Sequence, residues 1–185
     1  MKKFLILALA TLGLKATSLT ADNFYVSAFG GGTYIQDDEK YIDFTYNLGY
    51  TYGGSMGYRW GCSGWRVEAE FAYSKNRIKR IEGFGFDLDV NAHQSYYRGM
   101  GNIIYDFCIP TSYAHPFVGV GAGWYQQKID LYNFNVKDDD IAWQALAGLS
   151  YEINTCYSLD IVYVMFKPKD DFYVHNARLV LRYNF

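Results

Sequence analysis

The chain has 185 residues, of which half are apolar, 19% are aromatic and 19% are charged, and its formal net charge is −2. A single domain is expected at this length, and the charge balance gives no sign of a nucleic-acid partner. The composition is too polar for a bundle of membrane helices, each of which needs about 20 apolar residues, and too aromatic for a disordered chain. Tyr (19 residues) and Gly (18) against only 3 Pro favour strands over helices.

The first residues, 1–21, have the pattern of a secretory signal peptide. Two lysines precede an apolar core at residues 4–14, and small residues follow, with cleavage expected after Ala21 or Ser18. The apolar run is too short to span a bilayer. We therefore expect export of the chain, with residues 22–185 as the mature domain.

From there on, apolar and polar residues alternate with period two, which is typical of β-strands. Eight strands are predicted, at residues 23–34, 46–60, 65–75, 93–107, 116–128, 141–153, 157–167 and 175–185. Short uncharged turns alternate with longer charged loops, which span residues 35–45, 76–92, 129–140 and 168–174. This is the layout of an outer-membrane barrel, with short periplasmic turns and longer external loops. The predicted fold is an all-β, eight-stranded antiparallel up-and-down transmembrane β-barrel.

The charges of these strands fall on one face. Ten of them lie opposite the apolar face, five of each sign: Arg59, Arg66, Glu68, Glu70, Arg98, Asp106, Glu152, Asp160, Arg178 and Arg182. We expect the apolar face to meet lipid and the charges to form ion pairs in the lumen. Because an eight-stranded barrel is just wide enough for side chains to fill it, the preferred prediction is a closed lumen, and the alternative is a narrow ion or proton channel.

The last strand places apolar residues at every second position up to a terminal phenylalanine: Leu179, Leu181, Tyr183 and Phe185. This ending resembles the carboxy-terminal assembly signal of bacterial outer-membrane barrels. Together with the segments GYRW at 57–60, NIIYDF at 102–107 and PFVGVGAG at 116–123, it resembles the OmpA-like and Opa-like surface-antigen barrels, here without a peptidoglycan-binding domain.

The resemblance implies a non-enzymatic surface protein in the outer membrane of a Gram-negative bacterium, with a structural role in the envelope. The four longer loops are then expected to serve adhesion or host contact, since binding residues tend to lie on loops held by a rigid scaffold. The expected partners are outer-membrane lipid and lipopolysaccharide, the barrel assembly machinery, and a host or extracellular surface ligand.

One pair of residues supports a different function. His93 and Ser95 are two residues apart, so both are expected to face lipid near the external side. A serine nucleophile needs an adjacent base, and the spacing resembles the His and Ser of the outer-membrane lipid A deacylase, with Asp130 as the third, acidic group. A lipid-modifying enzyme is therefore the main alternative, weighed against two ordinary polar residues at the interface.

The three cysteines, Cys62, Cys108 and Cys156, each fall in a predicted short turn, on the side that we assign to the oxidising periplasm. One disulfide could form, either Cys62–Cys108 or Cys108–Cys156, which leaves one thiol over. The spacings match no zinc-ligand pattern, and we expect neither a metal nor a cofactor.

Overall fold

The computed structural model describes residues 23–37, 43–46, 48–60, 63–83, 86–109, 112–131, 134–168 and 172–185. The predicted signal peptide lies outside them. These residues form nine β elements: β1 (Phe24–Asp37), β2 (Asp43–Tyr46), β3 (Gly49–Arg59), β4 (Trp65–Gly83), β5 (Phe86–Asp106), β6 (Ala114–Leu131), β7 (Phe134–Glu152), β8 (Tyr157–Lys167) and β9 (Phe172–Asn184). No described segment is a helix that is long and apolar enough to cross a membrane.

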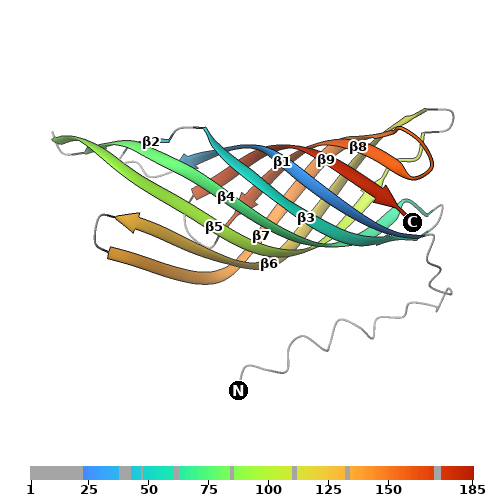
Figure 1. Cartoon of the computed structure of the whole chain (residues 1–185), viewed down its shortest axis with the longest axis horizontal. Helices are drawn as coiled ribbons and strands as arrows, with labels where there is room; N and C mark the ends of the chain where they lie inside the picture. Colours follow the sequence, from blue (N-terminus) through green and yellow to red (C-terminus); the bar gives the residue numbers. More distant parts are fainter. Residues whose placement is uncertain are drawn as a thin grey trace, which may run out of the picture.

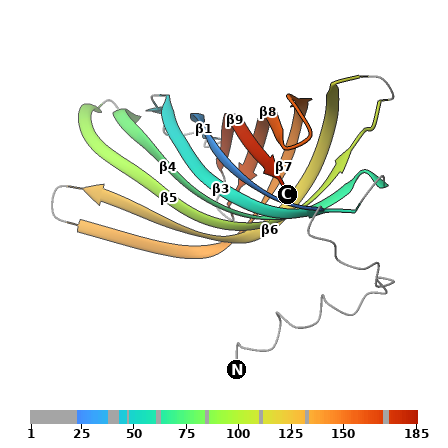
Figure 2. The same cartoon turned by 45° about the vertical axis from the view of Figure 1, so that its right-hand side comes forward.

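The strands form one closed antiparallel sheet. Consecutive strands pair around the barrel, β1 pairs with β9, and the pairing of β4 with β5 completes the ring. β2 precedes β3 in the chain and pairs with the part of β4 that lies beyond the first residue of β3. β2 and β3 therefore occupy one strand position of the barrel. The nine elements therefore make eight strands, and the predicted barrel is confirmed. The strands run obliquely along its long axis, with the C-terminus at one end and the β4–β5 hairpin projecting at the other (Figures 1 and 2).

Side chains alternate between the lumen and the outer wall. Along β8, burial changes at nearly every residue, with Asp160 and Val162 buried and Ile161 and Tyr163 at least half exposed. Large apolar side chains are exposed on the outside of every long strand, whereas most buried polar residues lie inside. This distribution suits a barrel whose outer wall meets lipid.

Aromatic side chains mark both ends of this wall. Near the short turns, the ring of Trp65 lies 4.9 Å from that of Tyr105, centroid to centroid. Towards the opposite end, Tyr73 lies between Tyr52 and Tyr97, at centroid distances of 5.3 and 4.8 Å. Such rows are typical of the two membrane interfaces of an outer-membrane barrel.

The predicted longer loops are largely strands, which corrects the sequence-based boundaries. Strands run through parts of all four, 35–45, 76–92, 129–140 and 168–174, and most completely through the second. There the pairing of β4 with β5 shifts register between Ile78 and Arg80. A bulge adds a residue to one strand and so reverses the face that later residues take. The period-two pattern breaks at that point, which is why the sequence resembled a loop.

Glycines allow large lumen side chains to lie flat against the neighbouring strand. Tyr25 of β1 is opposite Gly57 of β3, and a Cβ on Gly57 would overlap the tyrosine ring. In the same way, a Cβ on Gly121 would overlap the side chain of Asn102. At these positions the packing of the lumen requires glycine.

Replacing Gly57 with Ala should therefore destabilise the barrel, because the added methyl group overlaps the buried Tyr25 ring. Overpacking of this kind costs about 1–3 kcal/mol. Gly99→Ala is the matched control, since a Cβ there meets nothing within 4 Å. Urea unfolding of the protein in lipid vesicles, followed by tryptophan fluorescence, would measure both variants, and equal stability would contradict the packing described.

Candidate functional site

The carboxylate of Glu70, which is buried, lies at the centre of a hydrogen-bonded network inside the barrel. Its Oε1 accepts a hydrogen bond from Arg178 Nη1 at 2.9 Å and lies 3.7 Å from Arg98 Nε. Its Oε2 accepts from Asn102 Nδ2 at 3.3 Å and from Gln144 Nε2 at 3.2 Å. Because these partners belong to β5, β7 and β9, one carboxylate of β4 connects four strands across the lumen.

A second group of charges lies nearer the short turns. The Asp106 carboxylate is 3.3 Å from Arg66 Nε and 3.7 Å from Arg59 Nε. Arg182 Nη2 donates to Asp160 Oδ1 at 3.4 Å. Four of these five side chains are buried, whereas Arg59 lies at the edge of the lumen with 30% of its side chain exposed.

Glu68 and Tyr25 connect the two groups. The Tyr25 hydroxyl donates to Glu68 Oε2 at 3.0 Å, and Asn102, which also contacts the first group, donates to Glu68 Oε1 at 3.4 Å. The guanidinium groups of Arg66 and Arg182 lie 5.8 and 5.4 Å from the centroid of the Tyr25 ring. An aromatic face stabilises a buried cation through the ring quadrupole. The charges inside the barrel are thus joined into one network.

Two buried apolar clusters also lie in the described lumen, and the alternation pattern alone did not identify them as clusters. One consists of Ile35, Tyr96, Met100, Tyr125, Ala142, Phe166 and Val174. The other consists of Ile104, Phe117, Leu146, Val162 and Val164. For the members on β5, β7, β8 and β9, the available signal was their spacing, an even number of residues from a predicted inward charge of the same strand; β1 and β6 carry none of those charges. Residue type gave no signal, since valine or leucine suits either face.

Among the described side chains, the space beside Glu70 is small. A cavity of about 30 Å³, bordered by Phe29, Arg66 and Glu70 among others, lies inside the barrel. This is room for about one water molecule. A polar pocket of about 210 Å³ opens at the short-turn end beside Arg59 and Glu152.

Glu152 was predicted to lie in the lumen, but the structure places it at the mouth of the barrel. Its side chain is 45% exposed, and its Oε1 is 4.0 Å from His115 Nε2. The reason is that β7 ends at Glu152, so the inward face of this residue opens into the mouth of the barrel.

The candidate catalytic residues are only partly brought together. His93 of β5 is opposite Asp130 of β6 in the strand register, and their side chains lie outside the part of the structure that is described. Ser95 is only 7% exposed, and its Oγ accepts a hydrogen bond from the Tyr73 hydroxyl at 3.2 Å. A serine hydroxyl that is covered in this way is poorly placed to attack a lipid.

Of the two alternative disulfides, Cys62–Cys108 and Cys108–Cys156, the structure does not form the second, because Cys108 and Cys156 are both free thiols. Each sulfur contacts its own turn, Cys108 at the backbone oxygen of Asp106 (3.9 Å) and Cys156 at Thr155 Oγ1 (3.8 Å). Cys62 lies outside the described residues. Among the described residues, no group of three or more His, Cys, Asp or Glu side chains could hold a metal ion.

The predicted assembly residues Leu179, Leu181 and Tyr183 share one exposed face of β9, and Phe185, which directly follows β9, is also exposed. β9 lies between β8 and β1, so it is the strand that joins the last part of the chain to the first.

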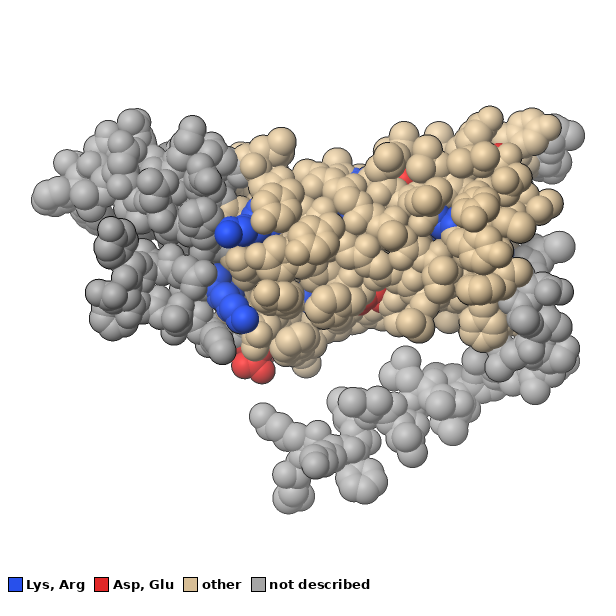
Figure 3. Space-filling view, viewed as in Figure 1, with Lys and Arg blue, Asp and Glu red and all other residues tan. Residues whose placement is uncertain are grey.

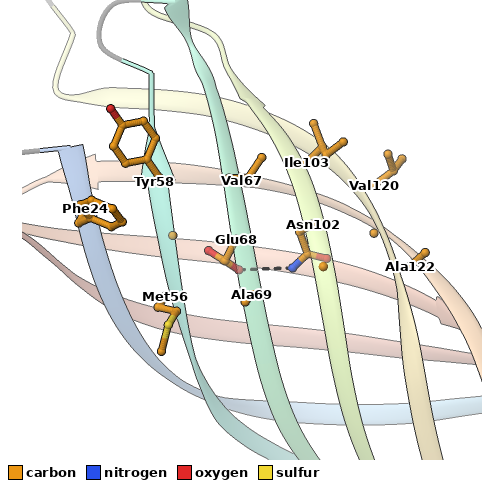
Figure 4. Close-up of a pocket in the computed structure, with 13 residues that line it drawn as sticks. Phe24, Met56, Tyr58, Val67, Glu68, Ala69, Asn102, Ile103, Val120 and Ala122 are labelled. Atoms are coloured by element: carbon orange, nitrogen blue, oxygen red, sulfur yellow. Dashed lines mark hydrogen bonds between the residues drawn. The ribbon is translucent and has the colours of Figure 1, made fainter. Parts of the chain in front are cut away.

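The outer wall also contains an apolar hollow. Ala69, Gly101 and Ala122 are opposite one another in the pairings of β4, β5 and β6, so small residues of three strands meet at one level. The hollow has a volume of about 810 Å³ and is bordered by larger side chains, shown in Figure 4: Phe24, Met56, Tyr58, Val67, Ile103 and Val120.

A closed eight-stranded antiparallel barrel with an apolar wall, aromatic girdles and a polar network inside defines a small outer-membrane barrel protein. The family described as "Outer membrane protein beta-barrel domain" matches residues 4–185, and the chain belongs to this family. A relative from Gluconacetobacter diazotrophicus, named "Outer membrane protein", is 27% identical over 180 residues. The match covers 80% of this chain and 46% of the relative, so the chain spans about half the length of that protein.

Solved structures show the same fold. Neisserial surface protein A superposes with a TM-score of 0.66 at 18% identity, over 90% of this chain and 98% of that one. The outer membrane protein OprG of Pseudomonas aeruginosa gives 0.60 at 14% identity, over 88% and 96%. Ail, the attachment invasion locus protein of Yersinia pestis, gives 0.56 at 17% identity, over 89% and 99%. Family and fold together place the protein in the outer membrane of a Gram-negative bacterium.

Replacing Glu70 with Gln should be strongly destabilising, because Arg98 and Arg178 would remain buried without their counter-charge. Breaking a buried ion pair costs about 3–5 kcal/mol. Glu152→Gln removes an exposed carboxylate and should change the free energy of unfolding by less than about 1 kcal/mol. Urea titration in lipid vesicles measures both, and a Glu70 effect no larger than the Glu152 effect would contradict the assigned network.

Proposed function

We propose that this protein is a non-enzymatic surface protein of the outer membrane. Its barrel is a closed structural support, and its extended hairpins contact surfaces outside the cell. The observation that carries this proposal is that the buried Glu70 network and the apolar clusters occupy the lumen, whereas several strands are longer than a membrane requires. Residues 1–21 act as the cleaved export signal, and the exposed face of β9 engages the barrel assembly machinery.

The filled lumen supports a structural role over a channel. Buried charges are paired across four strands, apolar clusters occupy much of the remaining space, and the cavity that borders Glu70 holds about 30 Å³. An ion would need a continuous wet path, which this packing opposes.

Purified protein in planar bilayers should therefore show no conductance above the detergent baseline. Glu70→Ala is an informative variant, because the loss of the central carboxylate leaves space and unpaired arginines, and we expect flickering currents from it. Discrete, cation- or anion-selective steps from the unmodified protein would contradict the closed-lumen proposal.

The lengths of the strands support a role for the external end. A membrane-spanning strand needs about 9–11 residues, and β8 has 11. β4 and β5 have 19 and 21 residues, and β6 and β7 have 18 and 19. About ten residues of each therefore extend past the membrane, roughly 30 Å along the strand. Hairpins on a rigid scaffold are suited to contact with other surfaces.

Shortening the β4–β5 hairpin by replacing residues 78–92 with a two-residue turn should reduce the binding of expressing bacteria to cultured epithelial cells. Heat-dependent gel mobility would verify that the shortened barrel folds. The matched control exchanges the residues of the same segment for Ser and Thr at constant length. Adhesion that remains unchanged when the β4–β5 and β6–β7 hairpins are both shortened would contradict this function.

The enzymatic alternative predicts a change in lipid A that the proposal does not. Because Ser95 is covered and bonded to Tyr73, we expect expression of the protein to leave the lipid A mass spectrum unchanged. The Ser95→Ala variant should give the same spectrum. Loss of an acyl chain with the unmodified protein, reversed by Ser95→Ala, would overturn the non-enzymatic assignment.

A further inference from the structure

Two lysines face outward at the external end of the wall formed by β4, β5 and β6. In the strand register, Lys75 and Lys128 stand on either side of Ser95, and the next row towards the membrane centre contains Tyr73 and Tyr97. Lys128 Nζ lies 4.9 Å from the centroid of the Tyr97 ring. The Lys128 ammonium group thus lies against the external aromatic row, and Lys75 occupies the same level of the sheet, which is the level expected for lipid headgroups.

Neither lysine makes an ion pair with a residue that the structure describes. The acidic side chain described on the same face is Asp139 of β7, which is opposite Gln126 and so lies diagonally next to Lys128, on the side away from Lys75. Figure 3 shows basic side chains exposed at this end, with an acidic side chain near them, and very few charged atoms along the middle of the wall. Lysines near a membrane surface attract anionic lipid headgroups.

A track without bulky side chains runs down the wall from these lysines. The outward residues of β5 below Tyr97 are Gly99 and Gly101. Gly99 is opposite Phe71 on one side and Trp124 on the other, and a Cβ on Gly99 would meet nothing within 4 Å. The two aromatic side chains therefore flank an open strip one strand wide.

The track ends in the hollow of Figure 4, which contains Gly101 in its lining. Six residues separate Ser95 from Gly101, which is about 20 Å along a strand. With a strand tilt of about 40°, this is roughly 15 Å of depth, or half of the bilayer core of about 30 Å. An acyl chain whose headgroup sits at the lysines would reach the hollow with its end.

We propose that β4, β5 and β6 form a binding site for one phosphorylated lipid of the outer leaflet, of the lipid A class. A phosphate lies between Lys75 and Lys128, and an acyl chain passes over Gly99 and Gly101 into the hollow. The position of both elements on one strand, at a separation that fits half a bilayer, distinguishes this occupant from a second copy of the chain, which would need no phosphate. The proposal depends on the membrane location of the barrel and not on adhesion or on the closed lumen.

The test is native mass spectrometry of the mature protein refolded in detergent micelles and titrated with diphosphoryl lipid A. The unmodified protein should retain one lipid A molecule, and dephosphorylated lipid A should bind about tenfold more weakly. The Lys75→Gln, Lys128→Gln double variant should lose about tenfold in affinity. Gly101→Leu should also weaken binding, because its side chain fills the hollow.

Matched controls lie outside the proposed site. Lys167→Gln, on β8, removes a lysine that donates to the Tyr173 hydroxyl. Ala147→Leu, on β7, enlarges an exposed small residue that does not line the hollow; neither should alter binding. Heat-dependent gel mobility would verify that every variant folds. Equal binding by the unmodified protein and the double lysine variant would overturn the proposal. So would displacement of the lipid by millimolar inorganic phosphate, or a dimer that Gly101→Leu dissociates.

Discussion

The barrel depends on the burial of one carboxylate, that of Glu70, beside a cavity with room for only about one water molecule. An isolated buried charge is strongly unfavourable, and here Arg98, Arg178 and two side-chain amides surround it. The two arginines are themselves held over aromatic rings, Arg98 over Phe166 and Arg178 over Phe29. A buried ion pair of this kind gives little net stability relative to an apolar core. Its effect is to require one relative position of β4, β5, β7 and β9.

The rest of the structure follows from placing polarity inside and apolar surface outside. The exposed Ile, Val and Leu side chains of the wall contact the acyl chains of the lipid, and the aromatic rows mark where the bilayer ends on each side. In the proposed function, a closed lumen gives a firm base on which the long strands continue past the membrane as paired hairpins. Small residues also lie on the outer wall, at Gly99, Gly101 and Ala122. There they leave the open surface on which the proposed lipid would lie.

Much of the fold could be predicted from the sequence, since alternation alone gives the strands and the charges give their inward face. The boundaries could not, because the bulge near Ile78 breaks the alternation inside a continuous hairpin. The sequence also could not predict which charges pair inside the barrel. Glu70 and Arg178 are 108 residues apart, and they meet only because the stagger of the closed sheet brings β9 across from β4. The prediction for Glu152 was wrong for a similar reason. The alternation along a strand shows which face a residue takes, but not how far along the barrel axis it lies.

The most direct test of the central claim is a double-mutant cycle between Glu70 and Arg178. The free energy of unfolding in lipid vesicles would be measured for the unmodified protein, Glu70→Gln, Arg178→Gln and the double variant. The account predicts a coupling energy of about 1–3 kcal/mol, as expected for residues within one buried network. A coupling energy indistinguishable from zero would mean that the two side chains do not meet in the membrane, and that the lumen is organised in some other way.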